Sequence, residues 1–270
     1  MQIHDNVVRI SVRGGQIAGT LIAPSRQVPG VLLAHGWGGS QQQYQQMVRS
    51  VAPLRCVCLT FDFSGHVATA SQRESVTRED NLGDILAAYD FLAAHPLVDP
   101  AAIAVVGSSY GGYLAAILTS LRPVAWLGLR APALYRDSDW DVPKHRLHRE
   151  QNLASYRQQR LAPHENRALR ACAAFNGDVL LVESEHDKIV PHPVLDNYRR
   201  ACIDASSLTC RTLPQADHAL TDERSRSSYA SILVHWLDEM MLGARGHLRS
   251  RTSMAPLKSA RSSSPAASRT

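Results

Sequence analysis

The sequence predicts an α/β fold with a mostly parallel central sheet, helices on both of its faces and an antiparallel hairpin at one edge. Short, wholly apolar runs alternate with amphipathic segments of helical period, as expected for strands that are covered on both faces. The first residues show strand-like alternation instead. With 270 residues, of which 44% are hydrophobic, the chain is long enough to bury a large core.

The N-terminal segment predicts the hairpin. Apolar and polar residues alternate over residues 8–12 and again over residues 17–21, and Gly14 and Gly15 lie between the two runs. Paired glycines between two alternating runs are typical of a tight β-turn. Only one face of such a pair needs to be buried, which suits the edge of a sheet.

The remaining elements follow in alternation. The apolar runs that predict strands are residues 30–34, 56–61, 102–106, 125–129, 179–183 and 208–213. The segments that predict helices are residues 40–51, 82–92, 110–121, 194–203 and 225–241.

The segment at about 132–176 interrupts this rhythm. It is long, polar and helical in pattern, so we expect a short helical lid above the strand ends. Residues 142–175 within it carry seven Lys or Arg and two Glu. A solvated helical face is the first explanation of this charge, and the alternative is that it attracts an anionic substrate, or a leaving group such as a CoA or carrier-protein thiol.

The chain is predicted to have one domain, residues 1–242, followed by a tail. Residues 243–270 are rich in Ser, Ala, Arg and Pro and hold six basic residues and no acid, whereas the whole chain has a net charge of +5. The high pI therefore belongs to this segment, which we expect to be a disordered basic extension. A nucleic-acid or anionic-membrane role is the alternative, but no nucleic-acid partner is expected.

Several protein classes are excluded by composition. No apolar run is long enough to span a membrane, and the N-terminus lacks the features of a secretory signal. The five cysteines have no Cys-x-x-Cys spacing, which argues against a zinc site or a disulfide framework. We expect a cytoplasmic protein with no metal and no cofactor, and the sequence leaves its oligomeric state open.

A nucleophile motif follows the apolar run at 102–106. Residues 107–112 read Gly-Ser-Ser-Tyr-Gly-Gly and so contain Gly-x-Ser-x-Gly centred on Ser109. A strand that turns directly into a helix strains its central residue and crowds the neighbours, so glycines are needed on either side. The motif predicts Ser109 as a nucleophile at a helix N-terminus.

A serine nucleophile needs a base and an orienting carboxylate. Asp187 follows the apolar run at 179–183 and is our first choice of acid. His218 follows the last predicted strand on a loop and is the predicted base. The other candidate acids near that strand are Asp178, Glu183 and Glu185.

Two backbone N–H groups are predicted to form the oxyanion hole. Tyr110 follows the nucleophile directly, and its N–H is the first donor. The second is expected after the first central strand, where residues 35–39 read His-Gly-Trp-Gly-Gly. Glycines allow the backbone to approach a substrate closely there, so Trp37 is the predicted donor.

These motifs resemble those of the α/β-hydrolase superfamily over residues 3–242. The Ser-Tyr-Gly-Gly and Asp-x-x-Val-Pro patterns are most similar to its dienelactone-hydrolase-like, serine aminopeptidase-like and prolyl-oligopeptidase-like branches. One departure is that the family usually has Gly-His-Gly-x-Ser where this chain has Gly65-His66-Val67, so substrate contacts of that loop cannot be transferred. The motifs that carry the resemblance are residues 35–39, 62–66, 107–112, 187–191 and 217–218.

The resemblance implies a serine hydrolase that cleaves an ester or thioester of a small acyl substrate through an acyl-enzyme. A serine peptidase or amidase is the alternative, although prolyl-oligopeptidase-like chains usually carry a large N-terminal propeller, which is not expected here. A non-catalytic binding protein on the same scaffold is a third reading, but neither Ser, acid nor His is missing. The aromatic residues that could line an acyl pocket, or simply pack, are Trp126, Tyr135, Trp140 and Tyr156.

Overall fold

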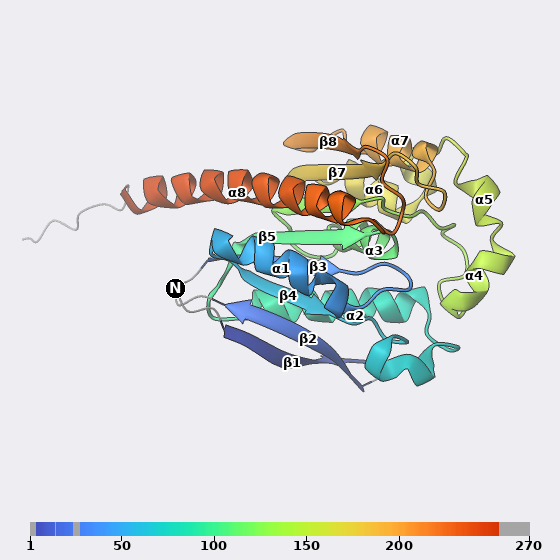
Figure 1. The fold of residues 1–270 in the computed structure, drawn as a ribbon, viewed down its shortest axis with the longest axis horizontal. Coiled ribbons are helices and arrows are strands. Elements are labelled where there is room, and N and C mark those ends of the chain that lie inside the picture. Colours follow the sequence, from blue (N-terminus) through green and yellow to red (C-terminus); the bar gives the residue numbers. More distant parts are fainter. Residues whose placement is uncertain (1–3, 14, 24–27, 254–270) are drawn as a thin grey trace, which may run out of the picture.

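An eight-stranded sheet forms the centre of the molecule (Figure 1). The computed structural model describes residues 4–13, 15–23 and 28–253. The strands lie in the order β1-β2-β4-β3-β5-β6-β7-β8. They are β1 (His4–Val12), β2 (Gly15–Ala23), β3 (Val28–Ala34), β4 (Val57–Phe61), β5 (Val98–Ser108), β6 (Trp126–Arg130), β7 (Asp178–Ser184) and β8 (Ser207–Leu213).

The sheet is antiparallel at one edge and parallel elsewhere. The hairpin of β1 and β2 joins the sheet through an antiparallel pairing of β2 with β4. From β4 to β8 every neighbouring pair is parallel. The α/β fold with an N-terminal hairpin at one edge is therefore confirmed. Because the parallel strands end at the same edge, the loops that follow β3, β5, β7 and β8 meet there.

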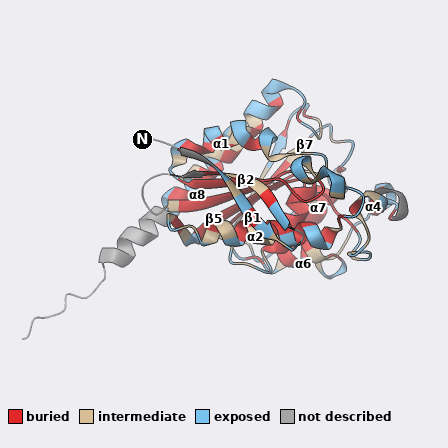
Figure 2. Ribbon diagram, turned by 90° about the horizontal axis from the view of Figure 1, so that it is seen from below, coloured by how far each residue is buried: buried red, intermediate tan, exposed pale blue. Residues whose placement is uncertain are grey.

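Helices cover both faces of the sheet and enclose two apolar cores (Figure 2). On one face, α1 (Gln45–Val51) and α8 (Glu223–Ser253) bury side chains against the strands. The other face is covered by α2 (Arg78–Ala93), α3 (Tyr110–Leu118), α6 (Arg167–Ala173) and α7 (His192–Ala201). The 3-10 helices are η1 (Gln41–Tyr44), η2 (Ala52–Leu54), η3 (Val67–Gln72) and η4 (Pro163–Glu165).

The segment predicted as a lid separates into two parts. Helices α4 (Lys144–Glu150) and α5 (Leu153–Tyr156) lie beyond the carboxyl ends of the strands (Figure 1). Helix α6 instead packs against α3 and α7, because its Ala168, Leu169 and Cys172 are buried. The elements that lie above the strand ends are therefore α4 and α5, and their action as a lid stays a prediction.

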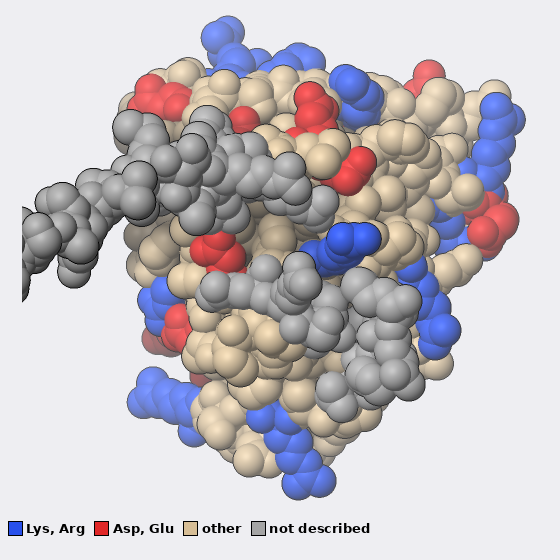
Figure 3. Space-filling view, turned by 90° about the vertical axis from the view of Figure 1, so that its left-hand side faces the viewer, with Lys and Arg blue, Asp and Glu red and all other residues tan. Residues whose placement is uncertain are grey.

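Helix α8 continues to Ser253 and so runs past the end of the domain predicted at 242. Residues 254–270, the rest of the predicted tail, lie outside the described residues. The face at the amino ends of the parallel strands shows basic and acidic side chains scattered among other residues (Figure 3). Within the described part of the chain, no helix combines the length and the apolar character needed to cross a bilayer.

Candidate active site

The turn between β5 and α3 holds Ser109 in a strained conformation. Its φ of 52° and ψ of −115° lie where L-residues with a side chain are rarely found. The turn is tight enough that a Cβ on Gly107 would lie 2.4 Å from the carbonyl oxygen of Gly111. Ser109 is therefore presented at the N-terminus of α3 in the manner expected of a nucleophile on a strand-to-helix turn.

The structure brings Ser109, His218 and Asp187 together. The His218 Nε2 atom lies 2.9 Å from Ser109 Oγ, and its Nδ1 atom lies 2.6 Å from Asp187 Oδ2. These partners assign the neutral tautomer, because a ring N–H at Nδ1 can donate to the carboxylate while Nε2 accepts from the hydroxyl. The arrangement can transfer the serine proton to the imidazole.

The Asp187 side chain is only 2% exposed and is held by its own loop. Its Oδ1 atom accepts hydrogen bonds from the backbone N–H groups of Ile189 and Val190. Burial acts to raise the pKa of this carboxyl, but the hydrogen bond from His218 and those two backbone N–H groups lower the pKa below its ordinary value. Asp187 is therefore held as an anion beside the imidazole.

The other candidate acids have different partners. Glu183 pairs with His192, Glu185 accepts from the backbone N–H of Gln215, and Asp178 accepts from Ser207. Among the described residues, Asp187 alone places a carboxylate against His218. Of the candidate acids, Asp187 is thus the one that lies next to the histidine, and its role as the catalytic acid stays a prediction.

The segment of residues 36–39, which we call the 36–39 loop, runs directly beside the nucleophile. A Cβ on Gly36 would lie 3.4 Å from Ser109 Cβ, at van der Waals distance, so the backbone of this loop lies directly against the serine. Tyr110 is the first residue of α3, so its N–H has no carbonyl acceptor within the helix. Both predicted oxyanion donors, Trp37 and Tyr110, are therefore next to Ser109 in the structure.

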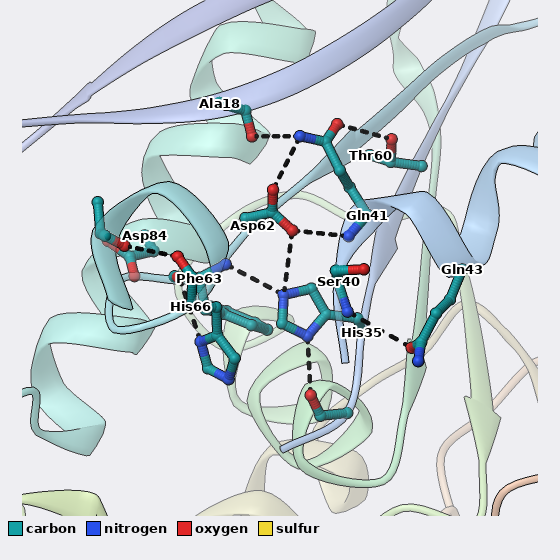
Figure 4. Close-up of polar contacts among 12 residues, drawn as sticks. Ala18, His35, Ser40, Gln41, Gln43, Thr60, Asp62, Phe63, His66 and Asp84 are labelled. Carbon is teal, nitrogen blue, oxygen red and sulfur yellow. Dashed lines mark hydrogen bonds and ion pairs between the residues drawn. The ribbon is translucent and has the colours of Figure 1, made fainter. Parts of the chain in front are cut away.

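Hydrogen bonds of the His35 ring connect the 36–39 loop to the segment that follows β4 (Figure 4). Its Nδ1–H donates to the carbonyl oxygen of Gly36, and its Nε2 accepts from the backbone N–H of Phe63. In a trans peptide the N–H points away from the C=O, so holding the Gly36 carbonyl also sets the direction of the Trp37 N–H. Burial lowers the pKa of His35 to about 3, which keeps the ring neutral for these two bonds.

Gln41 and Asp62 anchor the end of the same connection (Figure 4). The Gln41 amide donates to the carbonyl oxygen of Ala18 on β2 and to Asp62 beyond β4. The Asp62 carboxylate also accepts from the Gln41 backbone N–H. The connection is thereby held from two neighbouring strands, as expected for a loop whose backbone N–H groups are predicted to receive an oxyanion.

A cavity of about 760 Å³ opens beside Ser109 and His218 and extends between α1 and α8. Its walls include the 36–39 loop and, of the four aromatic residues singled out in the sequence, Tyr135. Two arginines in the wall, Arg130 and Arg157, were not predicted as site residues. Arg130 is the charged last residue of the apolar strand β6, and that was the signal in the sequence that could have identified it.

No metal site is formed by the side chains that the structure describes, because they contain no group of three or more potential ligands. The arrangement around Ser109 uses a hydroxyl, an imidazole and a carboxylate, which suffice for acyl transfer.

Comparison with known proteins gives one family match. The model of the prolyl oligopeptidase family matches residues 74–243, which is more than half of the chain and includes Ser109, Asp187 and His218. No curated protein sequence matches the chain.

Solved structures with the same fold include several esterases. Carboxyl esterase 2 from Tuber melanosporum is 14% identical, with a TM-score of 0.65 and coverage of 89% of this chain and 88% of the other. An esterase from Pyrobaculum calidifontis is 18% identical, with a TM-score of 0.63 and coverage of 88% and 86%. Est1E from Butyrivibrio proteoclasticus, solved with ferulic acid, is 16% identical, with a TM-score of 0.65 and coverage of 87% and 98%. At these identities the likeness establishes the α/β-hydrolase fold.

Proposed function

Since the chain belongs to the prolyl oligopeptidase family, we propose that it is a serine hydrolase that cleaves an ester or thioester of a small acyl substrate. The observation that carries this proposal is the position of His218, within hydrogen-bonding distance of both Ser109 Oγ and the Asp187 carboxylate. The cavity of about 760 Å³ beside them falls in the range of pockets that take small molecules.

The proposed reaction has two acyl transfers. Ser109 Oγ attacks the carbonyl carbon while its proton moves to His218 Nε2. The bond from that carbon to the leaving oxygen or sulfur then breaks, and His218 returns the proton to the leaving group. A water molecule, deprotonated by His218, attacks the acyl-enzyme and releases a carboxylic acid and free Ser109.

The remaining residues have supporting roles in the proposal. The N–H groups of Trp37 and Tyr110 would donate to the oxyanion of each tetrahedral intermediate. The Asp187 carboxylate would keep the imidazole in its tautomer and stabilise its cation during the transfer. No redox or metal cofactor takes part.

Replacing the nucleophile tests the proposal. The variant Ser109→Ala should lose turnover of p-nitrophenyl acetate by about 10⁶-fold if the three residues act as a unit, measured by release of nitrophenolate. The control Ser231→Ala changes an exposed serine on α8 and should keep full activity. Substantial turnover in the Ser109→Ala protein would remove the assignment.

A serine peptidase or amidase is the second candidate, because the matching family is named for a peptidase. The rates of cleavage of a matched ester, acyl-CoA and aminoacyl anilide distinguish a peptidase or amidase from an esterase or thioesterase. Faster cleavage of the anilide would make the peptidase the preferred function.

A non-catalytic binding protein is the third candidate function. It would not react with a fluorophosphonate probe, since only an activated serine is labelled.

A further inference from the structure

Two buried arginines line the cavity beside the nucleophile. Arg130 is 7% exposed and ends β6, whereas Arg157 is 5% exposed and directly follows α5. A buried guanidinium keeps its charge at any pH at which a protein folds, so it needs an anion or strong dipoles nearby.

Both arginines have neutral partners. Arg130 donates from Nε to Ser108 Oγ and from Nη1 to the His218 carbonyl oxygen, at 3.1 and 2.8 Å. Arg157 donates from Nε and Nη1 to the carbonyl oxygens of Leu134 and Ile189. No carboxylate of a described residue lies within ion-pair distance of either guanidinium. Among the side chains that the structure describes, neither guanidinium in this cavity is therefore paired with an anion.

Arg226, a third arginine in the cavity wall, is different. Its guanidinium forms two hydrogen bonds to the Glu223 carboxylate, at 2.9 and 3.1 Å. This pair is largely exposed and already neutral as a unit. The contrast identifies Arg130 and Arg157 as the cations that lack an anion.

Arg130 lies close to the reacting atoms. Its carbonyl oxygen accepts from the Ser109 N–H at 2.9 Å, and its side chain reaches the backbone of His218. Its Nη2 atom donates to no described residue, so this N–H edge remains for a ligand, while the guanidinium carbon lies 5.9 Å from the ring centroid of Tyr229. Tyr44 and Tyr229, which also line the cavity, interact with the same Ser108 side chain and add two hydroxyl groups.

We propose that Arg130 binds a carboxylate on the substrate, so that the preferred substrate is an ester or thioester with a carboxylate near its scissile bond. Arg157 adds positive charge to the same cavity. The inference rests on the proposed function, because it names the substrate class of that site. A charge-assisted hydrogen bond to a largely buried guanidinium favours the anionic substrate by about 10- to 100-fold over a neutral one.

Two substrate pairs test this. Ethyl hydrogen succinate carries the carboxylate on the acyl side, and ethyl succinamate is its neutral analogue of nearly the same shape. Acetoxyacetate carries the carboxylate on the alcohol side, and acetoxyacetamide is its neutral analogue. We expect kcat/KM to favour the anion by about 10- to 100-fold in one pair, which also tells on which side the carboxylate lies. Equal rates within both pairs, or a preference for the neutral analogues, would overturn the proposal.

Variants show whether Arg130 is responsible. Arg130→Gln should bring the ratio of anionic to neutral substrate close to one, and Arg130→Lys should keep part of it. The ratio is the readout because Arg130 also holds His218, so a general loss of activity affects both substrates alike. The matched control Arg160→Gln removes an exposed arginine near α5 and should leave the ratio unchanged. A ratio that survives in Arg130→Gln would refute the role of Arg130.

The wild-type protein gives a second readout that needs no variant. Succinate should slow the labelling of Ser109 by a fluorophosphonate probe, and succinamide at the same concentration should not. Equal labelling rates would count against the carboxylate site. Labelling of Ser109 and turnover of the neutral esters test whether the protein is a serine hydrolase at all. A failure of that proposal can therefore be distinguished from a failure of the proposed carboxylate site.

Discussion

At the scale of single residues, Lys144 is a buried cation next to the 36–39 loop. It begins α4, is 3% exposed, and its Nζ donates to Asn81 Oδ1 at 3.0 Å. The same atom lies 5.1 Å from the ring centroids of Trp37 and Tyr110. Lys144 thus connects the segment above the strand ends to both predicted oxyanion donors.

The pKa of Lys144 gives a prediction about stability. Burial lowers this pKa from its ordinary value of 10.5 to about 7, although Asp84 acts to raise it. Between these two pH values the unfolded chain holds a proton that the folded protein has released, so stability rises with pH. The rise reaches up to about 1.4 kcal/mol per pH unit between pH 7 and 9.

The variant Lys144→Met isolates this contribution. Urea unfolding at pH 7, 8 and 9 should show a smaller rise of stability with pH in the variant than in the wild type. Other charged groups near this lysine, His66 and Arg73 among them, are present in both proteins. Their contributions to the pH dependence of stability therefore largely cancel when the variant is compared with the wild type. An identical rise in both would mean that Lys144 keeps its ordinary pKa in the folded state.

The residues of the proposed triad were predictable because each carries its own local signal. Ser109 has glycines at fixed spacing, and Asp187 and His218 each follow a strand at the expected place in the chain. Arg130 has only a weak signal, its charge at the end of an apolar strand, and Lys144 has none, because an arginine ending a strand or a lysine in a basic segment is usually solvated. Their burial depends on packing between elements far apart in the sequence.

At the scale of elements, the β5–α3 turn depends on close approach of backbones. A Cβ on Gly111 would lie 2.4 Å from the carbonyl oxygen of His35 and 2.5 Å from that of Ala34. Helix α3 therefore lies directly against the end of β3, and this contact sets the distance between the nucleophile and the 36–39 loop.

Gly111→Ala should force β3 and α3 apart. We expect a loss of about 2–4 kcal/mol in the free energy of unfolding, measured with urea, together with a fall in kcat. Gly83→Ala is the matched control, because a Cβ at that exposed position in α2 meets nothing within 4 Å. This control should gain up to about 1 kcal/mol from better helix propensity. A Gly111→Ala protein as stable as the control would contradict the close contact.

The sequence predicted the strands better than the segment at 132–176. Buried strands such as β4 and β6 are apolar apart from Thr60 and the terminal Arg130, so their positions agree with the structure to within a residue or two. Helix α6 is only two turns long, and the polar character of the segment around it did not separate it from α4 and α5. Its place in the helical layer follows from contacts with α3 and α7, which no local pattern records.

At the scale of the whole molecule, α8 closes the second of the two cores. Its Leu233, Leu237 and Met241 are fully buried and pack with side chains of α1 and the sheet. Leu242, in contrast, is 55% exposed. The buried contribution of α8 that the structure describes therefore ends at Met241, close to the domain end proposed at 242.

Shortening the chain tests this boundary. A protein ending at Gly243 keeps every described buried residue of α8, so its melting temperature should change by less than about 2 °C, and its rate on p-nitrophenyl acetate should equal that of the full chain. A protein ending at Ser231 loses Leu233, Leu237 and Met241 and uncovers the core beneath α1, so it should fail to fold cooperatively. Melting curves by circular dichroism compare the three chains. If the chain that ends at Gly243 loses much of its stability or activity, residues 244–270 contact the domain and the boundary must move toward the C-terminus.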